Sequence, residues 1–345
     1  MPKLAAAVVL ALVGRVASHG AIVTPRSRNS IDFLDNVTGR TIAACINVTG
    51  SDCHNGQAAF WYSQGCFIGC KECDHASGRR QTDLCGAGEV ATNNNPMTRS
   101  LNRAAPAGSK YDIYRHNPWR WPGNAPVADA CGLAGGTPWG WDAAEEGLYV
   151  NTSYAYHGMK GTALPELPTG AVWKAGGRAE VTWQLRYNHG GGYQFRLCPA
   201  SEPLTEACFQ RTPLEFASAV HRLEWADTPN ATLNTPPGST TINATLVSTG
   251  TTPAGSTWAM NPLPYSNAAQ APTTGTGTFE PPCEETVDRK KSDTGRCSGR
   301  DPFNTLIVDT LRVPAVAPGK YVLSLRWDCE KSAQIWTNCA DIEIQ

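Results

Sequence analysis

The sequence carries little charge, and neither sign is in excess. Asp, Glu, Lys and Arg make up 17% of the 345 residues, and the formal net charge is −1. Proteins that bind nucleic acid normally present a basic stripe, so the near-neutral balance argues against that class. The 41% of hydrophobic residues can form a sizeable core, which argues against global disorder. Together with 11 Trp, the 33 Gly and 25 Pro favour a loop-rich β protein over a helical bundle.

Familiar catalytic motifs and long apolar runs are also missing. The sequence has no Gly-x-Ser-x-Gly elbow, no His-Glu-x-x-His pair, no P-loop and no Rossmann glycine pattern. Paired acidic residues occur at Glu145-Glu146 and Glu284-Glu285, but a glycosidase needs a defined separation of two carboxylates, which a sequence does not show. Beyond residue 18, no segment approaches 18 uninterrupted apolar residues, so we expect no membrane-spanning part.

The first 18 residues are typical of a secretory signal peptide. Lys3 precedes the apolar run of residues 4–13, and Val16-Ala17-Ser18 places small residues where a signal peptidase cuts. All 13 Cys follow this site, and an oxidising compartment would pair most of them, with one left free or paired between chains. We therefore expect a secreted, extracellular protein. Five N-x-Ser/Thr sequons are possible glycan sites, at Asn36, Asn47, Asn151, Asn230 and Asn243.

Cleavage after Ser18 would make His19 the first residue of the mature protein. An amino-terminal His offers a free α-amine and an imidazole, and the two can chelate one metal ion together. The amine titrates at about pH 8, so it can lose its proton to a metal, and neutral nitrogen ligands suit copper. The alternative is cleavage one or two residues away, in which case His19 is incidental.

The clearest strand pattern surrounds a second histidine. Residues 180–187 alternate polar and apolar, Gly190-Gly191-Gly192 interrupts the pattern, and residues 193–198 resume it. This pattern predicts a β-hairpin with His189 at the turn end of its first strand. Residues 320–327 and 340–344 also alternate, and we expect them to be closing strands.

The rest of the chain is expected to be mostly loops within a single domain, residues 19–345. Residues 35–170 are rich in Cys, Gly, Pro and Trp, which predicts a long loop region held by disulfides. Residues 228–278 hold 14 Thr and no charged residue among 51 positions, a composition that favours an exposed loop. We interpret this segment as an insertion rather than a linker between two domains, because the closing strands follow it.

The start of the mature chain, His19-Gly20-x4-Pro25-x-Ser27-Arg28, resembles that of lytic polysaccharide monooxygenases. The resemblance is closest to auxiliary activity family 10, formerly called chitin-binding, and to family 15. Residues 181–199, which include Asn188-His189-Gly190, are similar to the segment that carries the second copper-binding His of these families. The resemblance implies an all-β, immunoglobulin- or fibronectin III-like β-sandwich with a large disulfide-rich loop region.

In these families two histidines form a brace that holds one copper ion. The resemblance implies that the ligands here are the His19 amine, the His19 ring and the His189 ring. It also implies oxidative cleavage of insoluble chitin or cellulose at C1 or C4 of the sugar. O2 or H2O2 and an external electron donor would take part in this reaction.

The resemblance also gives candidate roles to four further residues. Trp336 takes the position beside the copper that is usually Phe or Tyr, and the alternative is an ordinary core Trp. Gln194 is a candidate catalytic group near the copper's reactive oxygen, although an exposed strand residue fits the pattern as well. Trp61 and Tyr62 are candidate substrate-binding aromatics, because sugar faces stack on such rings, and a role in the core fits equally.

Two other functions fit the same residues. The chain could be a non-catalytic chitin- or glycan-binding protein, or a secreted copper-binding protein without activity on polysaccharide. The spacing Cys66-x3-Cys70-x2-Cys73-x-His75 matches a zinc site, but a disulfide loop is the stronger interpretation in a Cys-rich secreted chain. Trp119 fits either a surface or a core role. His221 has no carboxylate pattern near it in the sequence, so we expect an ordinary structural or surface role.

Overall fold

The computed structural model describes residues 19–33, 62–63, 118–134, 154–156, 158–187, 190–225, 238–263, 305–330 and 334–345. The expected signal peptide, Trp61 and His189 lie outside these ranges. No helix in the described part of the chain is long and apolar enough to cross a membrane.

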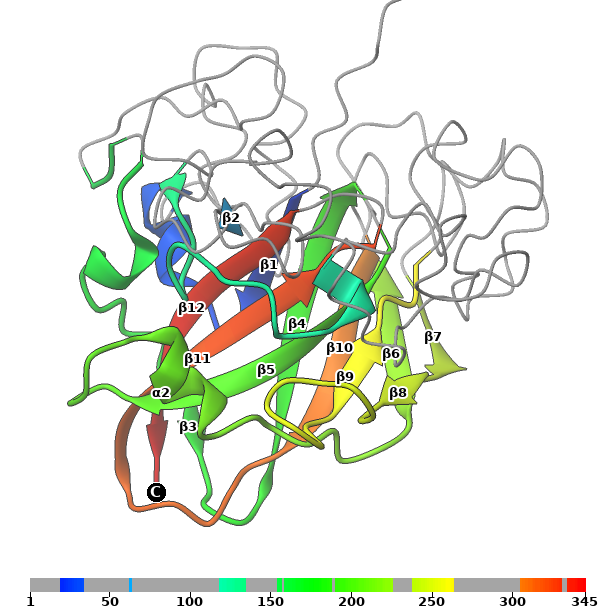
Figure 1. Ribbon diagram of the computed structural model, residues 1–345. Helices are drawn as coiled ribbons and strands as arrows, with labels where there is room; N and C mark the ends of the chain where they lie inside the picture. The colour runs from blue at the N-terminus through cyan, green and yellow to red at the C-terminus, as the bar shows by residue number, and fades with distance from the viewer. Residues whose placement is uncertain are drawn as a thin grey trace, which may run out of the picture.

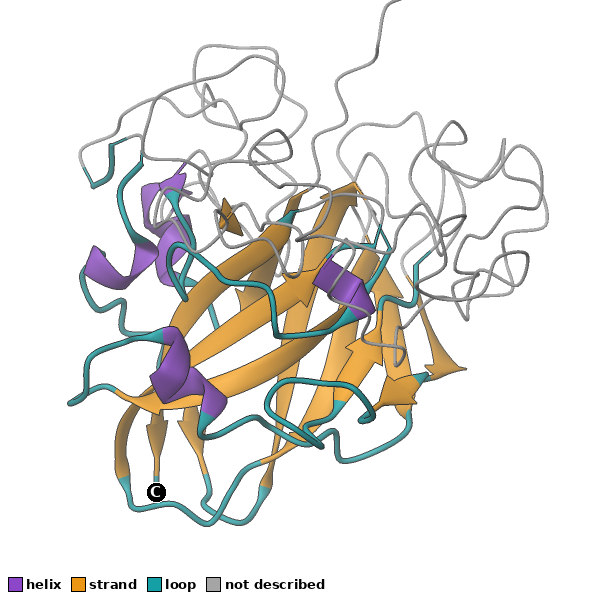
Figure 2. Cartoon of the chain, in the orientation of Figure 1, coloured by secondary structure: helices purple, strands orange, loops and turns teal. Residues whose placement is uncertain are grey.

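Two β-sheets pack face to face and hold the core between them (Figure 1, Figure 2). Sheet A has the order β1 (His19–Thr24), β4 (Arg178–Tyr187), β10 (Thr305–Arg312), β6 (Val220–Trp225) and β7 (Gly238–Asn243). Sheet B has the path β2 (Tyr62–Ser63), β12 (Ile335–Ile344), β11 (Gly319–Asp328), β5 (Gly192–Pro199), β9 (Trp258–Met260) and β8 (Leu246–Val247). A further strand, β3 (Val172–Trp173), pairs with β12 in parallel. The predicted all-β sandwich is confirmed.

The helices in the described residues are short and lie outside the sandwich (Figure 2). The α-helix α2 begins after Thr205, whose side chain accepts a hydrogen bond from the backbone N of Cys208 and so caps the first turn. The helices are the 3-10 helices η1 (Arg28–Phe33), η5 (Pro118–Arg120) and η7 (Gly161–Ala163) and the α-helix α2 (Glu206–Gln210).

Aromatic side chains from both sheets meet in the core. Strand alternation sends every second side chain to one face, and Trp183 of β4, Tyr193 of β5 and Trp327 of β11 are all fully buried. The ring centroid of Trp183 lies 4.5 Å from that of Tyr193 and 5.6 Å from that of Trp327. Full burial of a large apolar side chain contributes about 1.5–3 kcal/mol, so these rings hold the two sheets together.

The predicted hairpin around His189 is wrong, because β4 and β5 lie in different sheets. The chain crosses from sheet A to sheet B between Tyr187 and Gly192. Strands that pair side by side and strands that face each other across a core show the same alternation, so the pattern did not distinguish the two arrangements. The predicted closing strands do pair, as β11 and β12, with Trp327 opposite Trp336.

The prediction of an exposed loop is wrong for the described part of the Thr-rich segment. Residues 238–263 contribute β7 to sheet A and β8 and β9 to sheet B. Thr is β-branched and suits a strand, and the side chains of Trp258 and Met260 are buried together on β9. The segment therefore extends both sheets.

Three polar side chains lie buried between the sheets. The Nδ1 of His221 on β6 lies 2.7 Å from Oδ1 of Asp309 on β10, and the Tyr193 hydroxyl donates to Oδ2 of Asp309 at 2.7 Å. Burial, followed by the charge of Asp309, raises the pKa of Tyr193 well above its usual value, so the hydroxyl keeps its proton. His221 has the structural role that we predicted, with a carboxylate supplied from 88 residues away.

A buried ion network covers the outer face of sheet B. Arg196 of β5 and Arg326 of β11 are at most 1% exposed, and both donate to Oε1 of Glu206 on α2. Arg326 also pairs with Asp328 at 2.7 Å. Burial alone would raise the pKa of Glu206, but the charges of Arg196 and Arg326 outweigh it and lower the pKa to about 2.

This network predicts a loss of stability in acid. Because the fold lowers the pKa of Glu206 from 4.5 to about 2, its contribution is present above about pH 4.5 and is lost as the pH falls towards 2. The lowering corresponds to about 3 kcal/mol of unfolding free energy at neutral pH. We expect Glu206→Gln to flatten the decline in unfolding free energy between about pH 5 and pH 2 in urea titrations. The exposed control Glu166→Gln should keep the wild-type decline, and an equally steep decline in Glu206→Gln would contradict the assignment.

Candidate metal centre

His19 is the first residue of β1, which forms one edge of sheet A. Its partner across the sheet is Tyr187, the last residue of β4. His189 follows Tyr187 by two positions in the sequence but lies outside the described residues. The register therefore places the backbone of His19 beside the end of the strand that leads into His189.

The Trp327 indole links the neighbours of the two histidines. Its Nε1 donates to the carbonyl oxygen of Gly190 at 2.8 Å. A Cβ on Gly20 would lie 3.0 Å from Cε3 of Trp327, so the absence of a side chain lets β1 pack closely on this ring. Alternation of residues 320–327 predicted that Trp327 lies in a closing strand, but it gave no sign of a role at the site, because alternation does not show which rings meet across a core.

Strand β12 lies across the beginning of β1. The side chain of Asn338 accepts from the backbone N of Ile22 at 2.9 Å and donates to the carbonyl oxygen of Gly20 at 3.1 Å. Trp336 precedes Asn338 by two residues on the same face, is 1% exposed, and has its ring centroid 6.4 Å from that of Trp327. Trp336 is thus a core residue on the face of β12 that meets β1, and its position beside copper stays a prediction.

The other residues of the amino-terminal motif fix β1 to the last strand. Arg28 donates to Asp341 of β12 through Nε at 2.7 Å, and its Nη2 makes a second bond to the same carboxylate. Both side chains are at most one-tenth exposed, and such bidentate pairs define geometry closely. The spacing from His19 to Arg28 is therefore explained by docking of this segment on β12.

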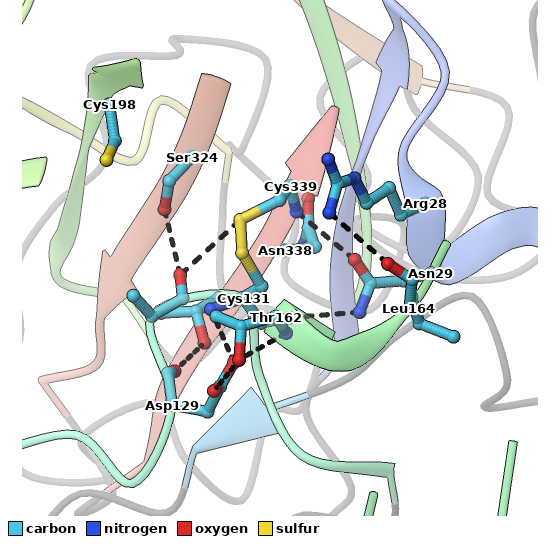
Figure 3. Close-up of a disulfide and its surroundings, with 12 residues drawn as sticks. Arg28, Asn29, Asp129, Cys131, Thr162, Leu164, Cys198, Ser324, Asn338 and Cys339 are labelled. Carbon is cyan, nitrogen blue, oxygen red and sulfur yellow. Dashed lines mark hydrogen bonds between the residues drawn. A yellow bond between two sulfur atoms is a disulfide. The ribbon is translucent and has the colours of Figure 1, made fainter. Parts of the chain in front are cut away.

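A disulfide holds the loop region against β12 (Figure 3). Cys131 is bonded to Cys339, 208 residues further on. The Asn29 amide bridges the two, donating to the carbonyl oxygen of Cys131 at 3.0 Å and accepting from the backbone N of Cys339 at 3.1 Å. The predicted disulfide-held loop region is confirmed around Cys131. A second bond, Cys198–Cys208, joins β5 to α2.

Gln194 does not lie with these residues. It is paired with Arg326 on β5 and β11, on the face of sheet B that carries the ion network. It is fully buried, and its Nε2 donates to the carbonyl oxygen of Thr257 at 3.1 Å. The alternative of an exposed strand position is therefore wrong. The structure does not bring Gln194 together with Trp336, and its catalytic role stays a prediction that this placement does not favour.

The candidate substrate aromatics are only partly within the described residues. Tyr62 lies in β2, opposite Trp336 on β12, which places its backbone near the candidate centre, whereas Trp61 lies outside. Trp119 is fully buried, so of its two alternatives the core role is the one observed.

The donor set fits a copper ion. Within the described ranges, no three side chains of His, Cys, Asp or Glu gather into a metal site, so a centre here depends on His19 and His189. With the expected cleavage after Ser18 they would offer one amine and two imidazoles, and nitrogen donors of this kind suit copper. The buried indoles of Trp327 and Trp336 beneath the start of β1 would form an apolar floor, and such a shell controls solvent access to a metal.

Comparison with known proteins gives matches to solved structures. No model of a known family matches the sequence, and no curated protein matches it. One match is an auxiliary activity family 10 lytic polysaccharide monooxygenase from Streptomyces lividans, at 10% identity and a TM-score of 0.23. It covers 52% of this chain and 60% of the Streptomyces chain, so this chain spans less than two thirds of that protein's length. A chitin-binding domain from Burkholderia pseudomallei (11% identity, TM-score 0.34) and a Cu(I)-bound CBM33 protein from Bacillus amyloliquefaciens (12%, 0.31) each match over 95% of this chain and 100% of theirs. In fold, the chain is similar to these solved structures, which include a lytic polysaccharide monooxygenase and a chitin-binding domain.

Proposed function

We propose that this chain is a secreted, copper-dependent lytic polysaccharide monooxygenase that cleaves insoluble polysaccharide. The observation that supports the proposal most directly is the register of β1 on β4. His19 is paired with Tyr187, two positions before His189 in the sequence. The two histidines are 170 residues apart in the chain, and this pairing supports the proposal that they meet at one end of the sandwich.

The residues around this end have separate tasks in the proposal. The amine and ring of His19 and the ring of His189 hold the metal. Copper held there would supply one-electron chemistry with O2 or H2O2, with electrons from an external donor, for the removal of hydrogen from C1 or C4 of the sugar. Trp327 and Trp336 keep water from the inner side. Asn338 holds the first residues of β1 in register by bonding to both Gly20 and Ile22.

The test uses the mature protein loaded with one copper ion. We expect oxidised oligosaccharides from chitin or cellulose in the presence of ascorbate and O2, detected by mass spectrometry. His189→Ala should give none, because it removes one of the three proposed ligands, and a melting curve of the same variant should show that it stays folded. His157→Ala is the matched histidine control and should remain active.

Each outcome discriminates among the functions. A folded His189→Ala protein with near-native activity would contradict the brace. A wild type that binds copper and chitin but yields no oxidised sugar would indicate a glycan-binding protein. A wild type that binds copper and neither chitin nor cellulose would indicate a copper-binding protein.

A further inference from the structure

The three residues that follow His189, here called the glycine turn (residues 190–192), are enclosed on several sides. All three are buried. The Trp327 Nε1 donates to the first carbonyl at 2.8 Å, and the backbone N of Asn261 donates to the second at 2.9 Å. The glycine turn is thus held from β11 on one side and from the residue after β9 on the other.

No side chain fits on the second or third position of the glycine turn. A Cβ on Gly191, whose φ is +78°, would lie 2.0 Å from the carbonyl oxygen of Asp328. A Cβ on Gly192 would lie 2.2 Å from Cη2 of Trp119 and 2.5 Å from the carbonyl oxygen of Ala259. The backbone is therefore in direct contact with a buried ring and with two other strands, and it has no room to shift towards them.

Trp119 is itself held in place by the end of β11 and by β9. Its side chain is fully buried, its backbone N donates to the carbonyl oxygen of Cys329 at 3.2 Å, and its ring centroid lies 6.4 Å from that of Trp258. The backbone N of Thr252 donates to the carbonyl oxygen of Pro122 at 2.8 Å. The segment around Trp119 and the described part of the Thr-rich segment therefore contact each other through a ring pair and a backbone hydrogen bond, next to the glycine turn.

We propose that Trp119 and strand β9 are positioning elements for the histidine pair. They hold the glycine turn, and because His189 directly precedes Gly190, they set where the His189 ring stands relative to His19. A metal site needs its ligands within about 0.5 Å of the productive geometry. The inference rests on the proposed copper function. It gives the described part of the Thr-rich segment a role in the support of the site.

The first test uses the metal-free protein, so that it does not depend on copper. We expect Trp119→Ala to speed amide hydrogen exchange about tenfold or more in the peptide that covers the glycine turn. The control is Trp173→Ala, which removes a buried Trp of β3. Trp173 pairs with Ile344 at the other end of β12, so this variant should leave exchange in the glycine-turn peptide unchanged. Trp119→Phe should stay closer to the wild type. Unchanged exchange in Trp119→Ala would overturn the inference whether or not the protein binds copper.

The second test measures the metal. We expect Trp119→Ala to lower Cu(II) affinity about 10- to 100-fold, as loss of an outer support of a ligand does, and to alter the Cu(II) EPR spectrum. Trp173→Ala should change neither. Faster exchange with native affinity and an unchanged spectrum would mean that Trp119 packs the turn without positioning the histidine. A wild type without copper binding would overturn the proposed function, and the exchange result would still decide whether Trp119 holds the turn.

A second variant covers the case in which Trp119→Ala does not fold. Gly192→Ala keeps the Trp119 ring and places a methyl group against it, so the turn has to move. Gly177→Ala is the matched control, because its Cβ would lie 2.9 Å from the carbonyl oxygen of Lys174, in the turn that precedes β4. Gly192→Ala should change the EPR spectrum and Gly177→Ala should not. Native spectra in both variants would overturn the inference.

Discussion

A protein that begins one residue before His19 should bind copper about 100-fold more weakly than the mature form, or worse. The added residue converts the α-amine into an amide, which removes one of the three proposed ligands. Loss of an outer-shell partner alone costs about 10- to 100-fold in affinity, so loss of a ligand should cost at least as much. Isothermal titration calorimetry of mature protein and of protein with one Gly ahead of His19 measures the difference.

The control adds the same Gly at the other end of the chain. Gln345 is exposed, and its backbone N donates to the carbonyl oxygen of Trp173, far along β12 from Trp336. A Gly after Gln345 should leave copper affinity unchanged. If the form extended at His19 binds as tightly as the mature form, the His19 amine is not a ligand.

The second large effect concerns stability rather than copper. Asp309→Ala should lower the free energy of unfolding by about 1–3 kcal/mol or more, because it removes the shared partner of two buried groups and leaves only their 3.3 Å contact with each other. These groups are the Tyr193 hydroxyl and the His221 ring nitrogen, both fully buried. Total stability of a domain is about 5–15 kcal/mol, so the variant should melt many degrees earlier. Urea denaturation followed by Trp fluorescence gives the value.

Exposed charges on the same sheet provide the comparison. Glu180 pairs with Arg222 on the outer face of sheet A, and Glu180→Ala should cost less than about 1 kcal/mol. Asp309→Asn keeps an acceptor for Tyr193 and should fall between the two. Equal stability of Asp309→Ala and Glu180→Ala would mean that the buried cluster contributes little.

Local patterns in the sequence predicted the strands of the core, but not their partners. Alternation at residues 180–187, 193–198 and 320–327 corresponds to β4, β5 and β11. The same patterns did not show that β4 and β5 belong to different sheets. Strand β9 was not predicted, because it lies in a Thr-rich segment and has only three residues, which is too short to show a period. Its two buried side chains, Trp258 and Met260, are two positions apart.

Contacts between distant residues account for the rest of what the sequence did not show. Glu206 meets Arg326 from 120 residues away, and no spacing rule connects them. At the candidate site, His19 was predicted from its place after the expected signal peptide. The structure pairs it with Tyr187, and its approach to His189 stays a prediction. Trp327 and Asn338 were missed, since their roles depend on the packing of β11 and β12 against β1.

The hydrogen bond from the backbone N of Ile22 to Asn338 spans 316 residues. During synthesis, the first strand of the mature protein therefore waits for nearly the whole chain before this partner exists. Folds dominated by such distant pairings form slowly, in about milliseconds to seconds for small domains and longer for larger ones. β1 can pair with β4 earlier, but until Asn338 is made the other edge of β1 lacks its contact with β12 and is open to association with other chains. The yield of folded protein should therefore depend on keeping this edge away from other copies of the chain until β12 has folded against it. Slow expression, or dilution during refolding, would do this.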